Sequence, residues 1–342
     1  MRIAVITNAF PPEARGGAGV IASDLVDLWR EDGHEVRVWT EYASWLKRGI
    51  LMRLFGHVFL DRRAGSCVSE IRAWNPNVVV THNLTGIGWG TGRALKTPTR
   101  KWIHVLHDVQ MFEPSGQMRD DRVTLWQRCW AWYRRQLFGE PTSVVSPTKW
   151  LLEAHQRRGF TFSHAHVIQN PAPKATVSKN KDKSGAWLFV GRLSEDKGAD
   201  AFYELAQACP EERFACIGDG PWQKRLSTLK NVTCFGAQPR EMVQKTMAKS
   251  RGVLVLSRLM ENQPTVILEA FTAGIPVIAT PMGGIPETVG NGGVVVRWGL
   301  RSWKDAIQEI KKNESLWREK IKTMHLKQEK THMLWQRTFE EF

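Results

Sequence analysis

The stretch Ser257–Glu287, SRLMENQPTVILEAFTAGIPVIATPMGGIPE, constrains the fold of this chain more than any other. It follows a short apolar run, 252–256 (GVLVL), which is typical of a strand buried in a parallel sheet. Pro264 then suits the first position of a helix that ends at Gly274, and the apolar run 276–280 (PVIAT) indicates a second strand. The order strand, loop, helix, strand predicts an α/β fold.

Two glutamates of this stretch are separated by seven residues, with Glu261 in the loop and Glu269 inside the helix. A helix that begins at Pro264 directs its free N–H groups and the positive end of its dipole at the loop, which suits a phosphate. Glu269 lies about one and a half turns further in, where its carboxylate can accept hydrogen bonds from ribose hydroxyls. The alternative is that both are ordinary exposed glutamates.

With its flanking segments N-Q-P, A-G-I-P-V-I-A-T and G-G-I-P-E, the stretch resembles the E-x7-E signature of retaining, nucleotide-sugar-dependent glycosyltransferases of family four. The resemblance implies the GT-B fold, two doubly wound Rossmann-like α/β domains that face each other across a cleft. It also implies that Glu269 holds the nucleotide ribose and that Glu261 touches the transferred sugar. Asn262, Gln263, Pro264 and Thr265 complete this donor-binding segment. Many members have a glycine-containing loop where this chain has Asn262 and Gln263, so the identity of the sugar stays open.

A chain of 342 residues exceeds what one hydrophobic core usually organises, so two domains are expected. We place an N-terminal, acceptor-side domain at 1–172, a linker rich in Pro, Lys and Ser at 173–185, and a nucleotide-sugar-binding domain at 186–325. In the resembled fold the last helix, here 326–342, crosses back to the first domain. Trp335 and Phe339, at i and i+4, are the residues expected to anchor it.

In the second domain, the segment GRLSEDKG resembles the G-R-L-x-x-x-K-G element of the family, whose arginine and lysine bind the donor phosphates. The resemblance therefore assigns Arg192 and Lys197 to the diphosphate. This fits the chemistry, because departure of a nucleoside diphosphate develops negative charge that fixed cations stabilise. It also assigns backbone contacts near the nucleotide to Gly218 and Gly236. The alternative is a pair of surface cations beside a turn.

The first domain opens as a strand, a glycine loop, a helix and a second strand. Residues 17–22 formally fit G-x-G-x-x-A of a nicotinamide-binding turn, but NAFPPEAR separates the first strand from these glycines, and that spacing does not fit. In the resembled family a P-P-x-x-x-G-G loop approaches the donor diphosphate, which implies this role for Gly16 and Gly17. A helix-starting turn without a ligand is the alternative.

Two further strands of this domain end in His82 and in His107-Asp108, and ligands of doubly wound sheets bind at the carboxyl ends of strands. The resemblance makes His107 the histidine that reaches the donor sugar, whereas we treat His82 as structural. Retention by two displacements would need a carboxylate nucleophile, and Asp108 is the only nearby option. The family favours attack on the same face of the sugar instead. No metal and no cofactor are expected, because Arg192, Lys197 and the helix start supply the positive charge.

The net charge of +14 favours an anionic partner: a membrane surface, a nucleic acid or a phosphorylated substrate. Segments 45–63 and 122–138 read as basic amphipathic helices. The first has an apolar face of Leu51, Leu54, Phe55 and Val58. The second has a stripe of Trp126, Cys129, Trp130, Tyr133 and Leu137, with Arg128 and Arg135 opposite. Such helices either contact an anionic membrane or pack into the core.

The sequence predicts a cytoplasmic protein, because its five cysteines are scattered, no apolar run is long enough to span a membrane, and its first segment reads as a strand. A peripheral place on the inner face of the membrane is a further expectation. The expected reaction is transfer of a hexose-type sugar from a UDP- or GDP-sugar to a glycan, lipid-linked or other hydroxyl acceptor, in cell-envelope or polysaccharide biosynthesis. Two alternatives remain: a sugar-nucleotide epimerase on the same fold, and a nucleic-acid-binding protein. The second lacks any recognition motif in this sequence, so no nucleic-acid partner is expected.

Overall fold

The computed structural model describes residues 1–12, 17–41, 45, 48–172 and 185–341. The predicted donor contact of Gly16 and the predicted linker 173–185, apart from Gly185, lie outside these ranges. The chain divides into two compact units: unit 1 comprises Met1–Pro171 and Thr331–Phe342, and unit 2 comprises Ala172–Lys330.

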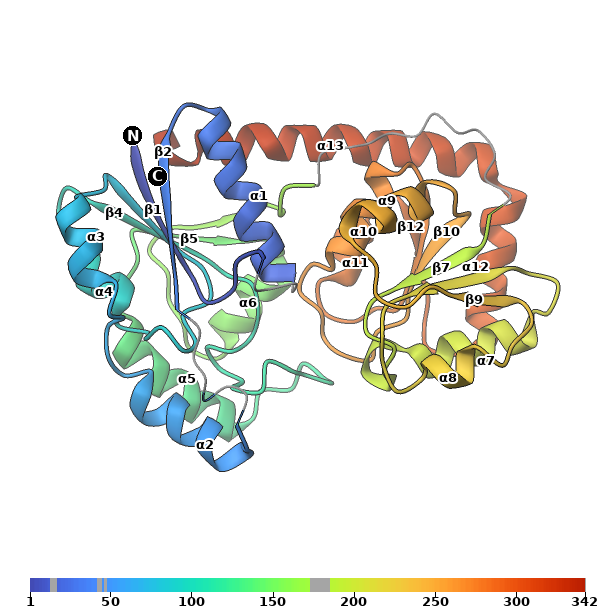
Figure 1. Cartoon of the computed structure of the whole chain (residues 1–342), viewed down its shortest axis with the longest axis horizontal. Coiled ribbons are helices and arrows are strands. Elements are labelled where there is room, and N and C mark those ends of the chain that lie inside the picture. Colours follow the sequence, from blue (N-terminus) through green and yellow to red (C-terminus); the bar gives the residue numbers. More distant parts are fainter. Residues whose placement is uncertain (13–16, 42–44, 46–47, 173–184, 342) are drawn as a thin grey trace. The chain divides into compact units, whose positions relative to one another are not determined.

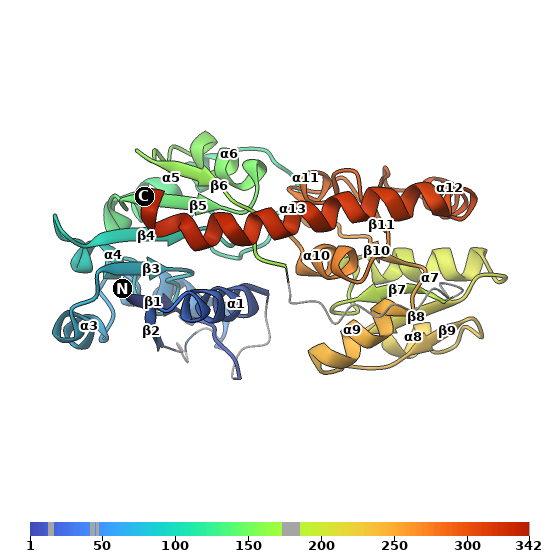
Figure 2. The same ribbon diagram turned by 90° about the horizontal axis from the view of Figure 1, so that it is seen from above.

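Unit 1 contains one parallel six-stranded sheet in the order β2-β1-β3-β4-β5-β6 (Figures 1 and 2). Its strands are β1 (Arg2–Thr7), β2 (Glu35–Thr40), β3 (Val78–Thr81), β4 (Lys101–Val105), β5 (Ser143–Ser146) and β6 (Ala165–Val167). Its helices are α1 (Gly17–Glu31), α2 (Ile50–Phe55), the π-helical η2 (Gly56–Leu60), α3 (Val68–Trp74), α4 (Thr91–Leu95), α5 (Leu125–Phe138) and α6 (Lys149–Arg157). Strands β3 and β5 are buried throughout, as expected for a parallel sheet covered on both faces.

Unit 2 repeats this architecture with the parallel order β12-β11-β10-β7-β8-β9. Its strands are β7 (Trp187–Val190), β8 (Phe214–Ile217), β9 (Val232–Cys234), β10 (Gly252–Val255), β11 (Val277–Ala279) and β12 (Gly293–Val295). Its helices are the 3-10 helix η3 (Glu195–Lys197), α7 (Ala199–Ala208), α8 (Gln223–Leu226), α9 (Arg240–Ala248), α10 (Thr265–Thr272), α11 (Ile285–Val289) and α12 (Leu300–Lys312). The fold class predicted from the sequence, α/β with doubly wound sheets, is confirmed in both units.

Alternation along the strands gives the unit 2 sheet two hydrophobic cores. Trp187 and Leu254 belong to the core that includes α7 and α12, whereas Leu188 and Val253 belong to the core that includes α10. Successive side chains of a strand point to opposite faces of the sheet. A sheet that is covered on both faces therefore needs apolar residues at successive strand positions.

The last helix, α13 (Glu314–Glu341), is continuous and has residues in both units (Figure 2). Trp335 and Phe339 lie in the core of unit 1. The indole Nε1 of Trp335 donates to the carbonyl of Gln169 at 2.7 Å, and the ring of Phe339 lies 5.1 Å from that of Trp29. These two aromatic residues therefore hold the end of the chain on the first sheet.

The segment 45–63 differs from its sequence prediction. Among its described residues, helix begins at Ile50, and Gly56–Leu60 are π-helical. The predicted apolar face is not packed in a core, because Leu51, Leu54 and Phe55 are exposed. The stripe predicted for 122–138 and the buried side of α5 share only Trp130. That buried side is made by Gln127, Trp130, Ala131, Arg134 and Phe138, whereas Trp126 and Cys129 are exposed.

Candidate functional site

The strand order of unit 2 reverses between β7 and β10, which are adjacent although two strands, β8 and β9, lie between them in the sequence. Loops that leave the carboxyl ends of two such strands diverge and open a crevice in which ligands of doubly wound sheets bind. The loop after β7 carries Arg192 and Lys197, and the loop after β10 carries Glu261. Three predicted site residues therefore meet at one edge of the sheet.

Lys197 and Glu261 form an ion pair at this edge, with 2.5 Å between Nζ and Oε1. The hydroxyl of Ser257 donates to the same carboxylate oxygen at 2.9 Å. Both charged side chains are partly exposed, at 35% for Lys197 and 20% for Glu261, so a ligand has access to them. The pair joins the loops that follow β7 and β10.

The backbone beside this pair is tightly packed. Gly198 has φ +83°, and a Cβ there would lie 1.8 Å from the carbonyl oxygen of Leu256. The backbone of Glu261 is fixed by Gly284, whose N–H donates to its carbonyl at 2.8 Å. Glycine at 198 is required by both the left-handed conformation and the close approach of the two loops.

Arg192 is held by Asp196, with 2.7 Å between Nη2 and Oδ2, and its side chain is 56% exposed. A third cation, Arg258, pairs with Asp200 and lies over the ring of Trp298 at 3.9 Å. The sequence prediction named Arg192 but missed its acidic partner. The i, i+4 spacing of Arg192 and Asp196 was the available signal.

Helix α10 begins at Thr265, one residue after the predicted start, and Pro264 is its N-cap with extended backbone. A proline has no side-chain acceptor for the first N–H groups of the helix. The N–H of Ile267 donates to the carbonyl of Pro264 at 3.0 Å, which leaves those of Thr265 and Val266 as the free donors expected at a helix start. Glu269 lies one turn after Thr265 on the same face, and helical side chains lean toward the N-terminus. The carboxylate of Glu269 is 12% exposed and lies 4.0 Å from Nε of Arg240. Asn262 is half-buried and Gln263 is buried in the preceding loop.

Gly218 and Gly236 follow β8 and β9, and their backbones are bonded to each other, with Gly218 N–H donating to the Gly236 carbonyl at 2.9 Å. Gly218 has φ +133°, and a Cβ there would lie 2.0 Å from the carbonyl oxygen of Gly191. The backbone at these two positions lies at the same carboxyl edge of the sheet as Lys197. Glycine thus allows the loops after β7 and β8 to approach closely.

In unit 1, Gly17 is the first residue of α1. His107 follows β4 and is half-buried. Its Nε2 lies 2.6 Å from Nδ1 of His82, which follows β3. Burial lowers the pKa of His107 to about 4, so its ring is neutral at pH 7.

Asp108 is hydrogen-bonded through both carboxylate oxygens: Oδ2 accepts from Asn83 Nδ2 at 2.6 Å, and Oδ1 accepts from the backbone N–H of Gln110 at 2.8 Å. Burial raises the pKa of this carboxyl group above its ordinary value, while these two hydrogen bonds oppose the shift. Asn83 also donates to the side chain of Gln110 at 2.8 Å. The carboxyl edge of the first sheet therefore carries a connected polar network.

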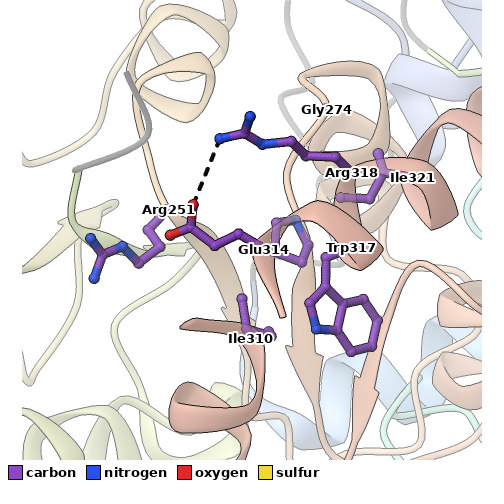
Figure 3. A pocket seen from close by; sticks show the side chains of 8 residues that line it. Arg251, Gly274, Ile310, Glu314, Trp317, Arg318 and Ile321 are labelled. Carbon is purple, nitrogen blue, oxygen red and sulfur yellow. Dashed lines mark ion pairs between the residues drawn. The ribbon is translucent and has the colours of Figure 1, made fainter. Parts of the chain in front are cut away.

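A small pocket of unit 2 lies beside the starts of β10 and β11 (Figure 3). Arg251, Trp317 and the ion-paired side chains of Glu314 and Arg318 line it. Its volume of about 20 Å³ holds roughly one water molecule. Because the strands are parallel, it lies at the amino end of the sheet, opposite the edge that carries the predicted site residues.

The described residues contain neither a metal-binding cluster nor a membrane-spanning helix. Among those residues, no group of three or more His, Cys, Asp and Glu side chains is placed to hold a metal ion. Within the same part of the chain, no helix combines the length and the apolar character needed to cross a bilayer.

Two family models match the chain. The model of Glycosyltransferase Family 4 matches residues 15–174, and the model of Glycosyl transferases group 1 matches residues 173–329. A GDP-mannose-dependent alpha-mannosyltransferase of Mycobacterium tuberculosis is 27% identical over 316 residues, which are 83% of this chain and 80% of the relative. An uncharacterised protein of the cps region of Klebsiella pneumoniae is 24% identical over 84% of this chain and 87% of its own length.

Solved structures share the fold. HepE of Anabaena in complex with UDP-glucose superposes with a TM-score of 0.72 at 16% identity, covering 100% of this chain and 98% of that one. WaaG, a glycosyltransferase involved in lipopolysaccharide biosynthesis, superposes with a TM-score of 0.61 at 17% identity, covering 94% of this chain and 93% of WaaG.

Proposed function

The chain belongs to the family 4 glycosyltransferases of the GT-B type, and we propose that it transfers a hexose-type sugar from a nucleoside diphosphate with retention at the anomeric carbon. The observation that carries this proposal is the Lys197–Glu261 pair at the point where the strand order of unit 2 reverses. It places a cation and a carboxylate beside the uncapped N-terminus of α10, the combination that a charged, hydroxyl-bearing donor requires.

The donor would be held through three kinds of contact in unit 2. Lys197, Arg192 and the first N–H groups of α10 bind the diphosphate, while Glu269 accepts hydrogen bonds from the ribose hydroxyls. Glu261 accepts from a hydroxyl of the transferred sugar. Gly218 and Gly236 allow backbone to approach the nucleotide closely. The proposal needs no metal ion, because the two cations and the helix N-terminus stabilise the leaving diphosphate.

The network around Asp108 favours attack on the same face of the sugar over a double displacement. Each oxygen of this carboxylate already accepts a hydrogen bond, and these bonds would weaken if that oxygen attacked the anomeric carbon. In the proposed reaction the leaving phosphate accepts the proton of the acceptor hydroxyl, and the sugar passes through an oxocarbenium-like transition state. His107, neutral at pH 7, contacts the donor sugar as a hydrogen-bonding group without adding charge.

The relatives guide the proposed donor and pathway. The mycobacterial relative is named for GDP-mannose, and the HepE structure contains UDP-glucose, so both nucleotides are candidates. The relative from the Klebsiella cps region and the putatively assigned colanic acid glycosyltransferase WcaL of Escherichia coli support a place in cell-envelope polysaccharide biosynthesis. The acceptor proposed is a hydroxyl of a growing glycan or of a lipid-linked sugar.

We further propose that unit 1 docks on an anionic membrane through an apolar patch on α2, η2 and α5. Figure 1 shows α2 beside α5, and the hydroxyl of Tyr133 on α5 donates to the carbonyl of Val58 on η2. The patch consists of Leu51, Leu54, Phe55, Phe59, Leu125 and Trp126, each at least 45% exposed. Exposed arginines accompany it: Arg48, Arg53, Arg62, Arg63 and Arg128. Apolar side chains beside arginines suit the headgroup region of an anionic bilayer.

The donor site is tested by thermal shift with UDP, GDP and ADP, followed by transfer from the matching nucleotide sugars. Saturating nucleotide should stabilise the protein by about 2.7 kcal/mol at a concentration of 100 Kd. The anomeric configuration of the product, read by NMR, tests retention. Failure of every nucleotide to bind would refute the donor site, and an inverted product would refute the same-face mechanism.

Membrane docking is tested separately by flotation with vesicles of anionic or neutral lipid. Phe55→Asp should abolish co-flotation with anionic vesicles, whereas Leu326→Asp should not, because Leu326 is 59% exposed on α13, outside the patch. Equal flotation of both variants would show that the patch does not bind lipid.

A further inference from the structure

His82, which the sequence analysis treats as structural, contacts the predicted site histidine directly. Its Nδ1 lies 2.6 Å from Nε2 of His107. The two ring planes are 24° apart with centroids separated by 4.9 Å. Nearly coplanar rings with such a short contact between nitrogens are edge to edge, the arrangement that a hydrogen bond in the ring plane needs.

The surroundings of His82 indicate which nitrogen carries its proton. Only 1% of the residue is exposed, and its Nε2 is buried with no hydrogen-bond partner among the described residues. Burial, with repulsion from His107 and His104, lowers the pKa of His82 well below its ordinary value, so the ring is neutral and has one N–H. A proton on Nε2 would be a buried donor without an acceptor, which folded proteins avoid. The proton therefore belongs on Nδ1, where it is donated to His107.

We propose that His82 is a positioning residue for His107. By donating to Nε2, it fixes the ring of His107 and places the proton of that ring on Nδ1. The identity of the protonated nitrogen in a histidine is set by the hydrogen bond that the other nitrogen makes. His107 then presents an N–H donor, suited to a hydroxyl oxygen of the donor sugar. This inference rests on the proposed role of His107 in sugar transfer.

The arrangement depends on the parallel pairing of β3 and β4. Thr81 pairs with His104 in this register, and both strands end within a few residues of that pair. The carboxyl ends of the two strands therefore bring the side chains that follow them to one edge. A slip of one residue would move His82 to the opposite face of the sheet. If position 82 served packing alone, an apolar side chain would suffice there. Packing does not explain an imidazole whose single N–H is directed at His107.

The kinetic test compares two substitutions of His82 in the full chain. Asn places an N–H donor where Nδ1 lies, whereas Leu fills the space without one. We expect His82→Leu to lower kcat about tenfold, the effect of losing roughly 1.4 kcal/mol of hydrogen bonding. His82→Asn should recover to within about threefold of wild type, since the donor to Nε2 is restored. The Kd for nucleotide should be unchanged in both, because the proposed nucleotide contacts lie in unit 2.

A double-mutant cycle separates positioning from packing. If His82 acts through His107, His82→Leu should lower kcat in the wild-type background but not in the His107→Ala background. A further loss in that background would overturn the inference, as would equal losses for the Leu and Asn variants.

A readout that does not depend on activity is the nitrogen NMR spectrum of histidine-labelled protein. We expect the His107 signal to report a proton on Nδ1 in wild type and a mixture of the two neutral forms in His82→Leu. A proton on Nε2 of His107 in wild type would overturn the inference even if transfer is observed. Full kcat in His107→Ala would instead refute the proposed role of His107 in transfer. The NMR spectrum would then decide only whether His82 donates a hydrogen bond to Nε2 of His107.

Discussion

Glu269 is the residue at which the proposed donor site is tested most sharply. Its carboxylate is 12% exposed, lies on the face of α10 that begins with Thr265, and is 4.0 Å from Nε of Arg240. Replacement by Ala removes the proposed acceptor for the ribose hydroxyls. It also removes a contact to an arginine that is 40% exposed, and such partly exposed pairs contribute only about 0–1 kcal/mol to stability. The variant should therefore fold.

The expected loss of affinity follows from the charge of the acceptor. A hydrogen bond to a charged group contributes about 1.5–3 kcal/mol, and the carboxylate of Glu269 is only 12% exposed, so water replaces little of it. We therefore expect the Kd of the preferred nucleoside diphosphate to rise about 10- to 150-fold, because each 1.4 kcal/mol corresponds to a factor of ten.

Calorimetric titration with two ligands isolates the ribose contact. The affinity for the 2′,3′-dideoxy nucleotide should already be low in wild type and should not fall further in Glu269→Ala. Glu204→Ala is a matched control, because Glu204 is an exposed glutamate on α7 of the same unit. If Glu269→Ala weakens the dideoxy and the ordinary nucleotide by the same factor, the carboxylate does not hold the ribose.

Three further predictions follow from other parts of the structure. Lys197→Ala should lower kcat about 10²- to 10³-fold in a steady-state transfer assay, because a preorganised charge at the leaving group is lost; an unchanged kcat would remove Lys197 from the site. Trp335→Ala should lower the free energy of unfolding of unit 1 by about 3–5 kcal/mol in urea denaturation, because it empties a buried site in the core; a loss below about 1 kcal/mol would show that Trp335 does not anchor α13. Burial lowers the pKa values of His107 and His155 to about 4, so between pH 6.5 and 4 the unfolded chain binds protons that the folded chain does not. The free energy of unfolding should therefore decrease as the pH is lowered through that window, by about 1.4 kcal/mol per pH unit for each histidine. Urea midpoints that do not change between pH 7 and pH 5 would contradict this prediction.

The order of elements in unit 2 could be predicted because most of its strands are short apolar runs next to a glycine or a proline. The runs 252–256 and 276–280 correspond to β10 and β11, and the helix between them begins within one residue of the prediction. The ion pair of Lys197 and Glu261 could not be predicted from spacing. It spans 64 positions and exists because β7 and β10 are neighbours, which depends on the strand order of the whole sheet.

Segment 122–138 shows where periodicity fails. An arginine is expected on the solvated side of an amphipathic helix, yet Arg134 is fully buried. Its partners are His57 and Asp61, at 3.2 and 3.4 Å from Nη2, and both belong to a segment more than seventy residues earlier. A buried charge is tolerated only when it is paired, so the burial of Arg134 depends on a contact that no local pattern contains. Trp126 is exposed, although the sequence placed it in one apolar stripe with the buried Trp130.

Acidic partners hold the cations at the carboxyl edge of unit 2. The pairs are Arg192 with Asp196, Lys197 with Glu261, and Arg258 with Asp200. This pairing reduces the local positive charge, so the net charge of +14 does not by itself explain attraction of a diphosphate to this edge. Its effect is geometric: a lysine whose ammonium group is fixed by a carboxylate has little rotamer freedom left to lose when it binds a phosphate. A cation fixed in this way stabilises developing charge without rearrangement. Glu261 would then act twice, because it orients Lys197 and accepts a hydroxyl of the sugar, and its removal should lower turnover more than it weakens nucleotide binding.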